Sequence, residues 1–144
     1  MATRLPNASQ QAAADAVVDR IDVGVTNATG RLRIYTGAQP ADADDAATGT
    51  LLVEILLANP AYGAANTSGT AALLSTPRSA AATAAGTAGW FRVLNRDNAG
   101  VYDGSIRATA DTDTGQELVL DNTSIAGGQT VNISSLGYTQ PASE

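Results

Sequence analysis

The stretch TAGWFRVLNRDNAGVYDGSIR, residues 87–107, decides the fold, because it holds the only tryptophan and the only phenylalanine of the chain. Two runs rich in aromatic and β-branched residues, 90–94 and 101–107, flank a segment of Asn, Asp and Gly. Strands separated by such turn-forming residues are typical of a β-hairpin. Phe91 and Trp90 fall on opposite faces of the first strand. We therefore expect one face to meet the core and the other to meet a second layer or a partner.

Further strands are predicted on both sides of this hairpin. Arg31–Thr36 alternates polar and apolar residues, which predicts a half-buried strand. Residues 50–57 (TLLVEILL) form the longest apolar run, which predicts a central strand covered on both faces. Short strands are expected at 71–74, 116–121 and 130–138, and an extended loop at 79–89. About seven or eight short strands at such spacing are typical of an antiparallel β-sandwich or a small barrel.

One helix is predicted, over residues 7–22, because apolar residues recur on one face of that segment. Asn7 stands where a capping residue would, Gln10 where its capping-box partner would, and Gly24 ends the pattern. We interpret residues 1–23 as an N-terminal arm and helix, 24–138 as a β-domain, and 139–144 as a frayed tail.

The composition excludes several classes of chemistry. The chain has 144 residues and a net charge of −6, and all eight of its basic residues are arginines. It has no cysteine and no histidine, so disulfides and thiolate or imidazole metal sites are excluded. The acidic balance disfavours nucleic acid and anionic membranes as partners. With no secretory pattern and no long apolar run, we expect a soluble protein without cofactors.

Catalysis at neutral pH would have to rely on carboxylates or unusual tyrosines, because histidine, cysteine and lysine are absent. A glycoside hydrolase built on two acids such as Glu54 and Glu117 is one open alternative. For Glu54 we expect a solvated position or an arginine partner. Acids at 111–115 resemble the opening of a calcium loop, but Asn122 stands where the closing glutamate belongs. We expect these acids, and those in the loop 37–49, to form solvated turns, and we expect no catalytic residue and no metal ligand.

Arginines lie on or beside the predicted strands and point instead to protein contacts. Arginine binds carboxylates through planar, forked contacts and is enriched at protein interfaces. The candidate interface residues are Arg31, Arg33, Tyr35, Trp90 and Arg92, with Tyr35 and Trp90 as aromatic anchors. Arg96 and Arg107 have similar settings. The alternative is that the arginines cover strand edges and pair with local aspartates.

Four segments carry a resemblance to a known family: RLRIYTG (31–37), GWFRVLNRDN (89–98), DGS (103–105) and LDNTSIAGGQTVNISS (120–135). The chain resembles the head decoration, or cement, proteins of tailed bacteriophages. This resemblance implies a β-sandwich-like structural protein, made in the host cytoplasm and present in many copies on the virion exterior. Its implied partners are the major capsid protein and copies of itself. A virion or tail adhesin that binds carbohydrate is the alternative of a different class.

Overall fold

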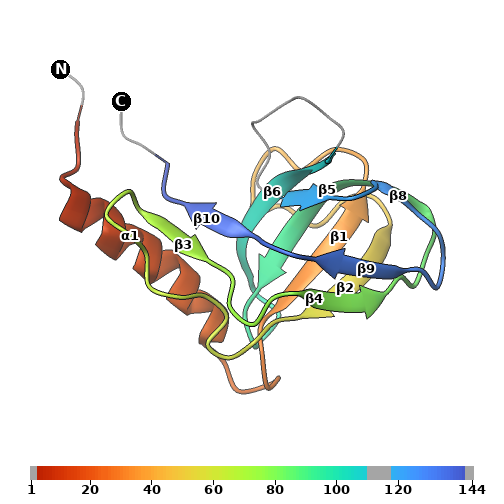
Figure 1. Cartoon of the computed structure of the whole chain (residues 1–144), viewed down its shortest axis with the longest axis horizontal. Coiled ribbons are helices and arrows are strands. Elements are labelled where there is room, and N and C mark those ends of the chain that lie inside the picture. The colour runs from red at the N-terminus through yellow and green to blue at the C-terminus, as the bar shows by residue number, and fades with distance from the viewer. Residues whose placement is uncertain (1–2, 110–117, 142–144) are drawn as a thin grey trace.

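The computed structural model describes residues 3–109 and 118–141 and is mainly β, with 39% strand and one N-terminal helix (Figure 1). The helix α1 (Asn7–Asp19) continues into a short 3-10 turn, η1 (Arg20–Asp22). The strands are β1 (Arg31–Thr36), β2 (Leu51–Leu56), β3 (Thr70–Ala72), β4 (Arg78–Ala81), β5 (Gly86–Leu94), β6 (Gly100–Ala108), β7 (Leu118–Leu120), β8 (Ser124–Ile125), β9 (Thr130–Ile133) and β10 (Gly137–Thr139). The predicted fold class is confirmed.

The main sheet is a curled half-barrel with the strand order β2-β1-β5-β6-β7, and β8 pairs with the start of β5. The hairpin β5–β6 is confirmed, and Asn95 closes its loop by accepting the N–H groups of Asp97 and Ala99 with its side-chain oxygen, both at 2.9 Å. Strand β7 runs parallel to β6, whereas the other pairs are antiparallel. Two small sheets, β10–β3 and β4–β9, complete the fold.

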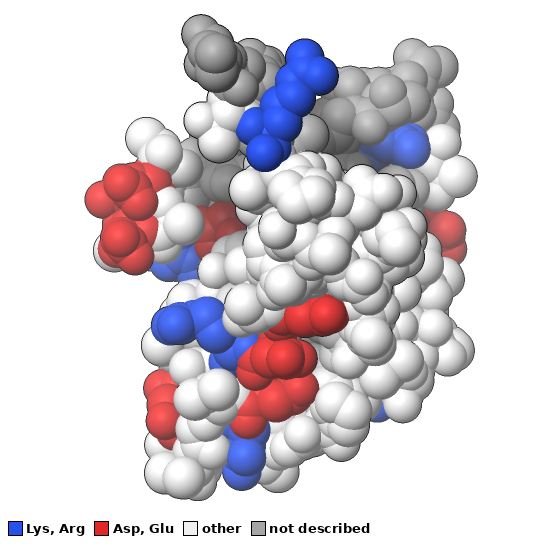
Figure 2. Space-filling model, turned by 90° about the vertical axis from the view of Figure 1, so that its left-hand side faces the viewer, with Lys and Arg blue, Asp and Glu red and all other residues white. Residues whose placement is uncertain are grey.

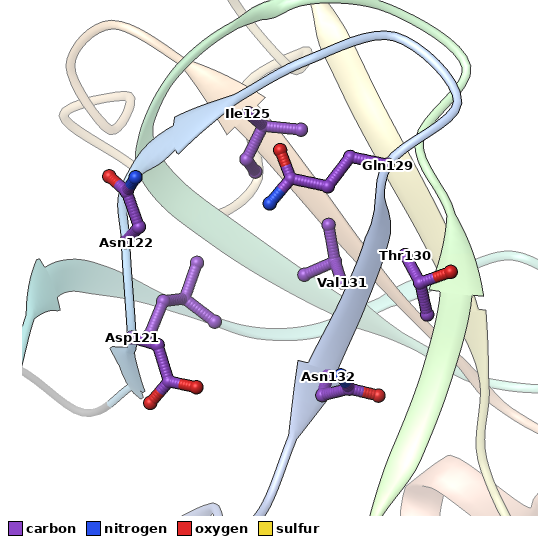
Figure 3. Close-up of a pocket in the computed structure, with 8 residues that line it drawn as sticks. Asp121, Asn122, Ile125, Gln129, Thr130, Val131 and Asn132 are labelled. Carbon is purple, nitrogen blue, oxygen red and sulfur yellow. The ribbon is translucent and has the colours of Figure 1, made fainter.

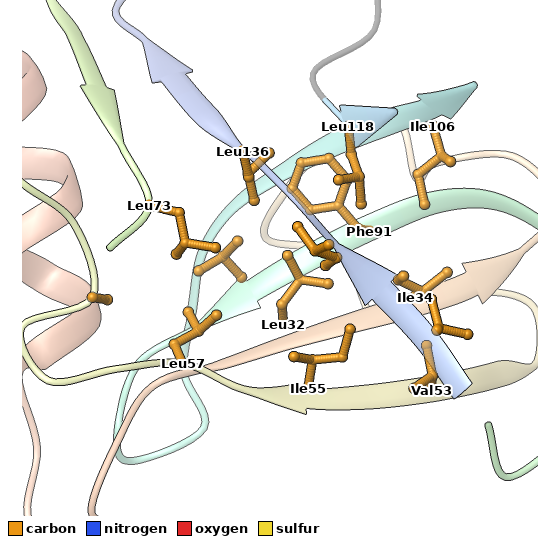
Figure 4. Close-up of a cluster of buried hydrophobic side chains, with 14 of the residues drawn as sticks. Leu32, Ile34, Val53, Ile55, Leu57, Leu73, Phe91, Ile106, Leu118 and Leu136 are labelled. Carbon is orange, nitrogen blue, oxygen red and sulfur yellow. The ribbon is translucent and has the colours of Figure 1, made fainter. Parts of the chain in front are cut away.

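The core lies between the main sheet and the segment that carries β9 and β10 (Figure 4). Alternate residues of the sheet point into it, among them Leu32, Ile34 and Phe91, each fully buried. Ile133 of β9 is also fully buried. Complete burial of side chains of this size contributes roughly 1.5–3 kcal/mol each. Without β9, this face of the sheet would be exposed to solvent, so β9 is as necessary to the core as the hairpin.

Three strand predictions were wrong. Residues 79–89 are not a loop, because they contain most of β4 and the start of β5. Residues 130–138 form two strands, β9 and β10, which belong to different sheets. Strand β2 is at the edge of the main sheet and not at its centre. Its apolar run reflects a bulge: the register with β1 skips Leu52, so that Leu52 and Val53 are both buried although they are adjacent.

Helix α1 shares this core, because Ala14 and Val18 are buried in it. The predicted cap was wrong: Pro6 occupies the N-cap, and Gln10 Nε2 donates to the carbonyl of Leu5 at 2.9 Å. Of the predicted tail, Thr139 lies in β10 and Gln140 N–H donates to the Gly69 carbonyl at 2.8 Å. No helix within the described residues has the length and apolarity needed to cross a membrane.

Candidate interaction surface

The main sheet brings the five candidate interface residues together on its outer face, opposite the core. Arg33 pairs with Arg92 in the register of β1 and β5, and Tyr35 pairs with Trp90. Arg31 lies two residues before Arg33 on the same strand. Because side chains alternate across a strand, all five point away from Leu32 and Ile34. The five residues chosen from the sequence as interface candidates therefore lie on one face of the sheet.

A row of charges crosses four strands on this outer face, in the order Glu54, Arg33, Arg92 and Asp103. The two arginines are direct cross-strand neighbours, an arrangement that is destabilising when uncompensated. Each is compensated by an acid on its other side: Arg33 Nε lies 2.6 Å from Glu54 and Arg92 Nε lies 2.7 Å from Asp103. The row is therefore two ion pairs placed back to back.

Glu54 binds two arginines, since Arg31 also donates to its second oxygen. Burial raises the pKa of Glu54, but the hydrogen bonds and charges of Arg33 and Arg31 outweigh burial and hold the pKa below its ordinary value. Glu54 therefore stays ionised, as expected for an arginine-paired acid and unlike a general acid. This pair is partly open to solvent, because about a quarter of each side chain is exposed.

Arg92 and Asp103 form a second, more deeply buried pair. Arg92 Nε and Nη2 each lie 2.7 Å from a different oxygen of Asp103. The remaining Arg92 donors reach the loop between β1 and β2, at the carbonyls of Asp45 (2.9 Å) and Ala43 (3.1 Å). The hydrogen bonds to Asp103, together with its negative charge, raise the pKa of Arg92. One arginine thus holds the loop 37–49 over the sheet.

Trp90 is not an exposed anchor, which corrects the role predicted for it. Its ring is fully buried, stacked on Tyr35 at a centroid distance of 4.6 Å and capped by the Arg92 guanidinium at 5.4 Å. Cation–π contact and ring stacking both stabilise such a layer. Over this face of the hairpin we expected either a second layer or a partner, and the loop 37–49 of the same chain lies there. Trp90, Tyr35 and Arg92 therefore organise the loop and leave little surface for a partner.

The other arginines have distinct settings. Arg96 Nε donates to the Asn27 carbonyl at 2.8 Å and so ties the hairpin loop to the segment before β1. Its neighbour Asp97 accepts the N–H groups of Val25 and Thr26, and these hydrogen bonds lower the pKa of Asp97. Arg107 donates to the Ala108 carbonyl at 3.3 Å. Arg96 and Asp97 hold the segment after α1 against the hairpin.

Carboxylates do not converge in the part of the chain that the structure describes, where no group of three or more potential metal ligands is found. Asp42 accepts the N–H of Asp44 at 3.0 Å, as in an ordinary turn. The predicted calcium-like loop at 111–115 and Glu117 lie outside the described residues. On the side that carries α1, charge gathers in a few patches on a mostly uncharged surface (Figure 2).

Several hollows mark the surface of the described residues. One, of about 80 Å³, lies between the β7–β8 segment and β9 and is shown in Figure 3. A water molecule takes about 30 Å³ of liquid, so this hollow admits little else. A second, of about 300 Å³, is lined by Tyr102 and Tyr138 beside Gln39. A third, of about 490 Å³, is a groove between β2 and β4.

The groove between β2 and β4 borders the arginine-bearing face, since Glu54 and Leu56, which lie opposite Arg33 and Arg31, line it. Its lining residues are Glu54, Leu56, Pro77, Arg78, Ser79 and Ala80. Leu56 is 52% exposed, although it is a large apolar residue on a strand. Arg78 spans one end of the groove by donating from Nε and Nη2 to the Leu56 carbonyl, at 2.9 and 2.7 Å. Arg78 was not among the interface residues predicted from the sequence, because its contact with β2 exists only in the folded chain.

In a comparison with known proteins, no family model, no curated protein and no solved structure matches this chain.

Proposed function

We propose that this protein is a structural virion protein that decorates the outer surface of a bacteriophage head and stabilises the shell. The observation that carries the proposal is the groove between β2 and β4, where an exposed leucine lies beside arginines on a strand at the edge of the sheet. Exposed apolar groups with arginines around them are typical of protein contact surfaces. The resemblance to head decoration proteins supplies the identity of the partner, the major capsid protein.

The segments that carry this resemblance support the proposal by their place in the fold. RLRIYTG contains β1, and GWFRVLNRDN covers most of β5 with the hairpin loop. The last segment runs from the end of β7 through β9. The segments that carry the resemblance therefore lie in the half-barrel and in the strand that closes its core, which suits a structural role.

Many copies on one lattice allow weak single contacts to suffice. When several sites on an assembled shell are engaged together, the overall avidity exceeds the affinity of one site by orders of magnitude. The net charge of −6 also suits a protein that assembles outside a shell filled with nucleic acid, because it disfavours binding to phosphate.

The direct test is co-sedimentation of the purified protein with expanded heads that lack decoration. We expect the protein to sediment with the heads in a fixed ratio to capsid subunits, and to raise the temperature at which the heads disrupt. Unexpanded heads are the matched control for surface specificity. Failure to sediment at saturating protein concentration, or turnover of a substrate by the isolated chain, would contradict the proposal.

A carbohydrate-binding adhesin is the second candidate, favoured by the hollow that Tyr102 and Tyr138 line. Their rings lie 5.0 Å apart at an interplanar angle of 56°, and aromatic rings are suited to packing against apolar faces of sugars. Asp103 also lines this hollow, but both of its oxygens already accept hydrogen bonds from Arg92. Tyr138→Ala should abolish glycan binding under this alternative and leave head binding unchanged under the first.

A further inference from the structure

Strand β6 is paired along its outer edge over only part of its length. Strand β7 pairs with residues 106–108 of β6, and Thr109 N–H, one residue further, donates to the Leu120 carbonyl at 2.8 Å. Hydrogen-bonding groups alternate along a strand, so the N–H and C=O groups of Asp103 point to the same side as those of Thr109. Val101 lies two residues before Asp103 on that edge. Within residues 3–109 and 118–141, no strand pairs with this edge at Val101 or Asp103.

The hollow of about 300 Å³ lies along this open edge, with Val101 and Asp103 in its wall. Ala43 of the loop 37–49 bounds the hollow on the outer face of the sheet, and Tyr138 of β10 bounds it on the core face. Ligand sites in proteins begin at about this volume. We call this hollow the β6 slot. It has a strand edge as its floor and a wall on each face of the sheet.

The polar side chains that line the β6 slot already have partners. The hydroxyls of Tyr102 and Tyr62 lie 2.6 Å apart, and the Tyr138 hydroxyl donates to Gln140 Oε1 at 3.1 Å. Both oxygens of Asp103 accept hydrogen bonds from an arginine. A sugar needs polar groups that can bond its hydroxyls, whereas an extended peptide needs an open strand edge and apolar surface. The slot therefore fits a peptide better than a sugar.

The loop 37–49 places negative charge beside the β6 slot. Three aspartates of this loop are exposed and form no ion pair within residues 3–109 and 118–141: Asp42, Asp44 and Asp45. Arg92 contacts the main-chain carbonyls of the loop, and its charge is paired with Asp103. Ala43, in the wall of the slot, is flanked by two of the aspartates. The charge of this wall is complementary to a cationic ligand.

We propose that the β6 slot binds an extended, basic segment of a second protein, which adds to the edge of β6 as a further strand. The N–H and C=O groups of Asp103 bond to its main chain, and its alternating side chains face the two walls. Apolar side chains pack on the rings of Tyr102 and Tyr138, while basic side chains meet the aspartates of the loop 37–49. This site goes beyond the proposed function, because β6 and the groove between β2 and β4 lie on opposite sides of the main sheet.

The test uses the full chain labelled with ¹⁵N and a short, end-blocked peptide of alternating valine and lysine, with the valine–glutamate peptide as control. We expect the lysine peptide to shift the amide signals of Val101 and Asp103, and the glutamate peptide to leave them unchanged. Val101→Pro should weaken binding of the lysine peptide at least about fivefold, because proline removes an N–H group from the edge and obstructs a neighbouring strand.

Asp44→Lys is a second variant that keeps the test valid if Val101→Pro disturbs the fold, because Asp44 is exposed in a loop. It should also weaken binding of the lysine peptide at least about fivefold, since it reverses a charge that faces the ligand. Asp19→Lys is the matched control: Asp19 is exposed on α1, and the variant has the same net charge as Asp44→Lys. We expect it to bind as the wild-type chain does.

Equal binding of both peptides, shifts confined to residues outside the β6 slot, or wild-type affinity in Asp44→Lys would overturn the inference. A titration with maltotriose tests the other occupant. If this sugar shifts the signals of Val101 and Asp103 and the lysine peptide does not, the slot is a sugar site and the inference fails.

Discussion

Asp103→Asn is expected to destabilise the protein by about 3 kcal/mol, because it leaves the buried Arg92 guanidinium without its counter-charge. The side chains of Asp103 and Arg92 are only 2% and 10% exposed, so solvent screens the pair weakly. Two charge-assisted hydrogen bonds of 2.7 Å are lost or weakened, each worth roughly 1.5–3 kcal/mol. The two loop carbonyls still accept from Arg92 and offset part of this loss. The lower end of the range is therefore expected.

A double-mutant cycle tests the reasoning further. Replacing Arg92 by Met removes the same pair and also frees the loop 37–49, whereas the double variant Arg92→Met/Asp103→Asn leaves no uncompensated charge. We expect the double variant to cost about 2 kcal/mol less than the sum of the two single variants. Glu54→Gln is the matched control, because its ion pairs are about a quarter exposed and should cost no more than about 1 kcal/mol.

Urea unfolding followed by tryptophan fluorescence is the suitable assay, since Trp90 is the only tryptophan and lies under Arg92. The slope with denaturant should stay constant across the series. Limited proteolysis should show faster cleavage within residues 37–49 in Arg92→Met than in Arg4→Met. A cost below about 1 kcal/mol for Asp103→Asn, or additive costs in the cycle, would refute the view that this pair is a buried, coupled unit.

Three further predictions concern packing and pH. Gly89→Ala should cost about 2 kcal/mol or more of stability, because a Cβ at this position would lie 2.0 Å from the Gly37 backbone oxygen, directly after β1. Gly127 has open space around it, so Gly127→Ala should change stability by no more than about 0.5 kcal/mol in the same urea assay. Ile133→Ala should cost about 2–5 kcal/mol if β9 closes the core, while Val25→Ala, at a side chain that is 89% exposed, should change the midpoint of unfolding little. The pKa of Glu54 lies lower in the folded than in the unfolded chain. Its ion pairs therefore stabilise the fold fully above the ordinary pKa of 4.5, and this stabilisation is lost as the pH falls through the folded-state pKa. Urea midpoints measured across that pH range should fall less steeply in Glu54→Gln than in the wild-type chain.

Local patterns predicted the elements whose residues differ sharply between their two faces. The alternation in RLRIYT identifies β1, and the aromatic runs around an Asn- and Gly-rich turn identify β5 and β6. Strand β4 escaped prediction because RSAA has no apolar face, and it is a strand only through its partner β9. The edge position of β2 escaped as well, because the bulge at Leu52 buries two successive side chains and imitates a strand covered on both sides.

The candidate surface was predictable in part, for a similar reason. Alternation along each strand groups Arg31, Arg33 and Tyr35 on one face of β1, and Trp90 and Arg92 on one face of β5. The pairing of β1 with β5 then joins the two groups. Whether such a face is open depends on remote segments. The thirteen-residue loop 37–49 folds back over Arg92 and covers the part of the face that carries Trp90. No local sequence pattern predicts this contact. Arg78 reaches the Leu56 carbonyl from 22 residues away, so its contribution appears only in three dimensions.

The position of β1 between β2 and β5 constrains how the protein is made. Arg31 pairs with Leu94, a separation of 63 residues because 94 − 31 = 63, whereas β2 is available to β1 much earlier. A nascent chain therefore holds β1 and β2 as a lone two-stranded ribbon, which is marginal in water, until the ribosome has released β5 and β6. Pairing across so long a separation makes for slow folding. Formation of the main sheet therefore has to wait until β5 and β6 have been synthesised.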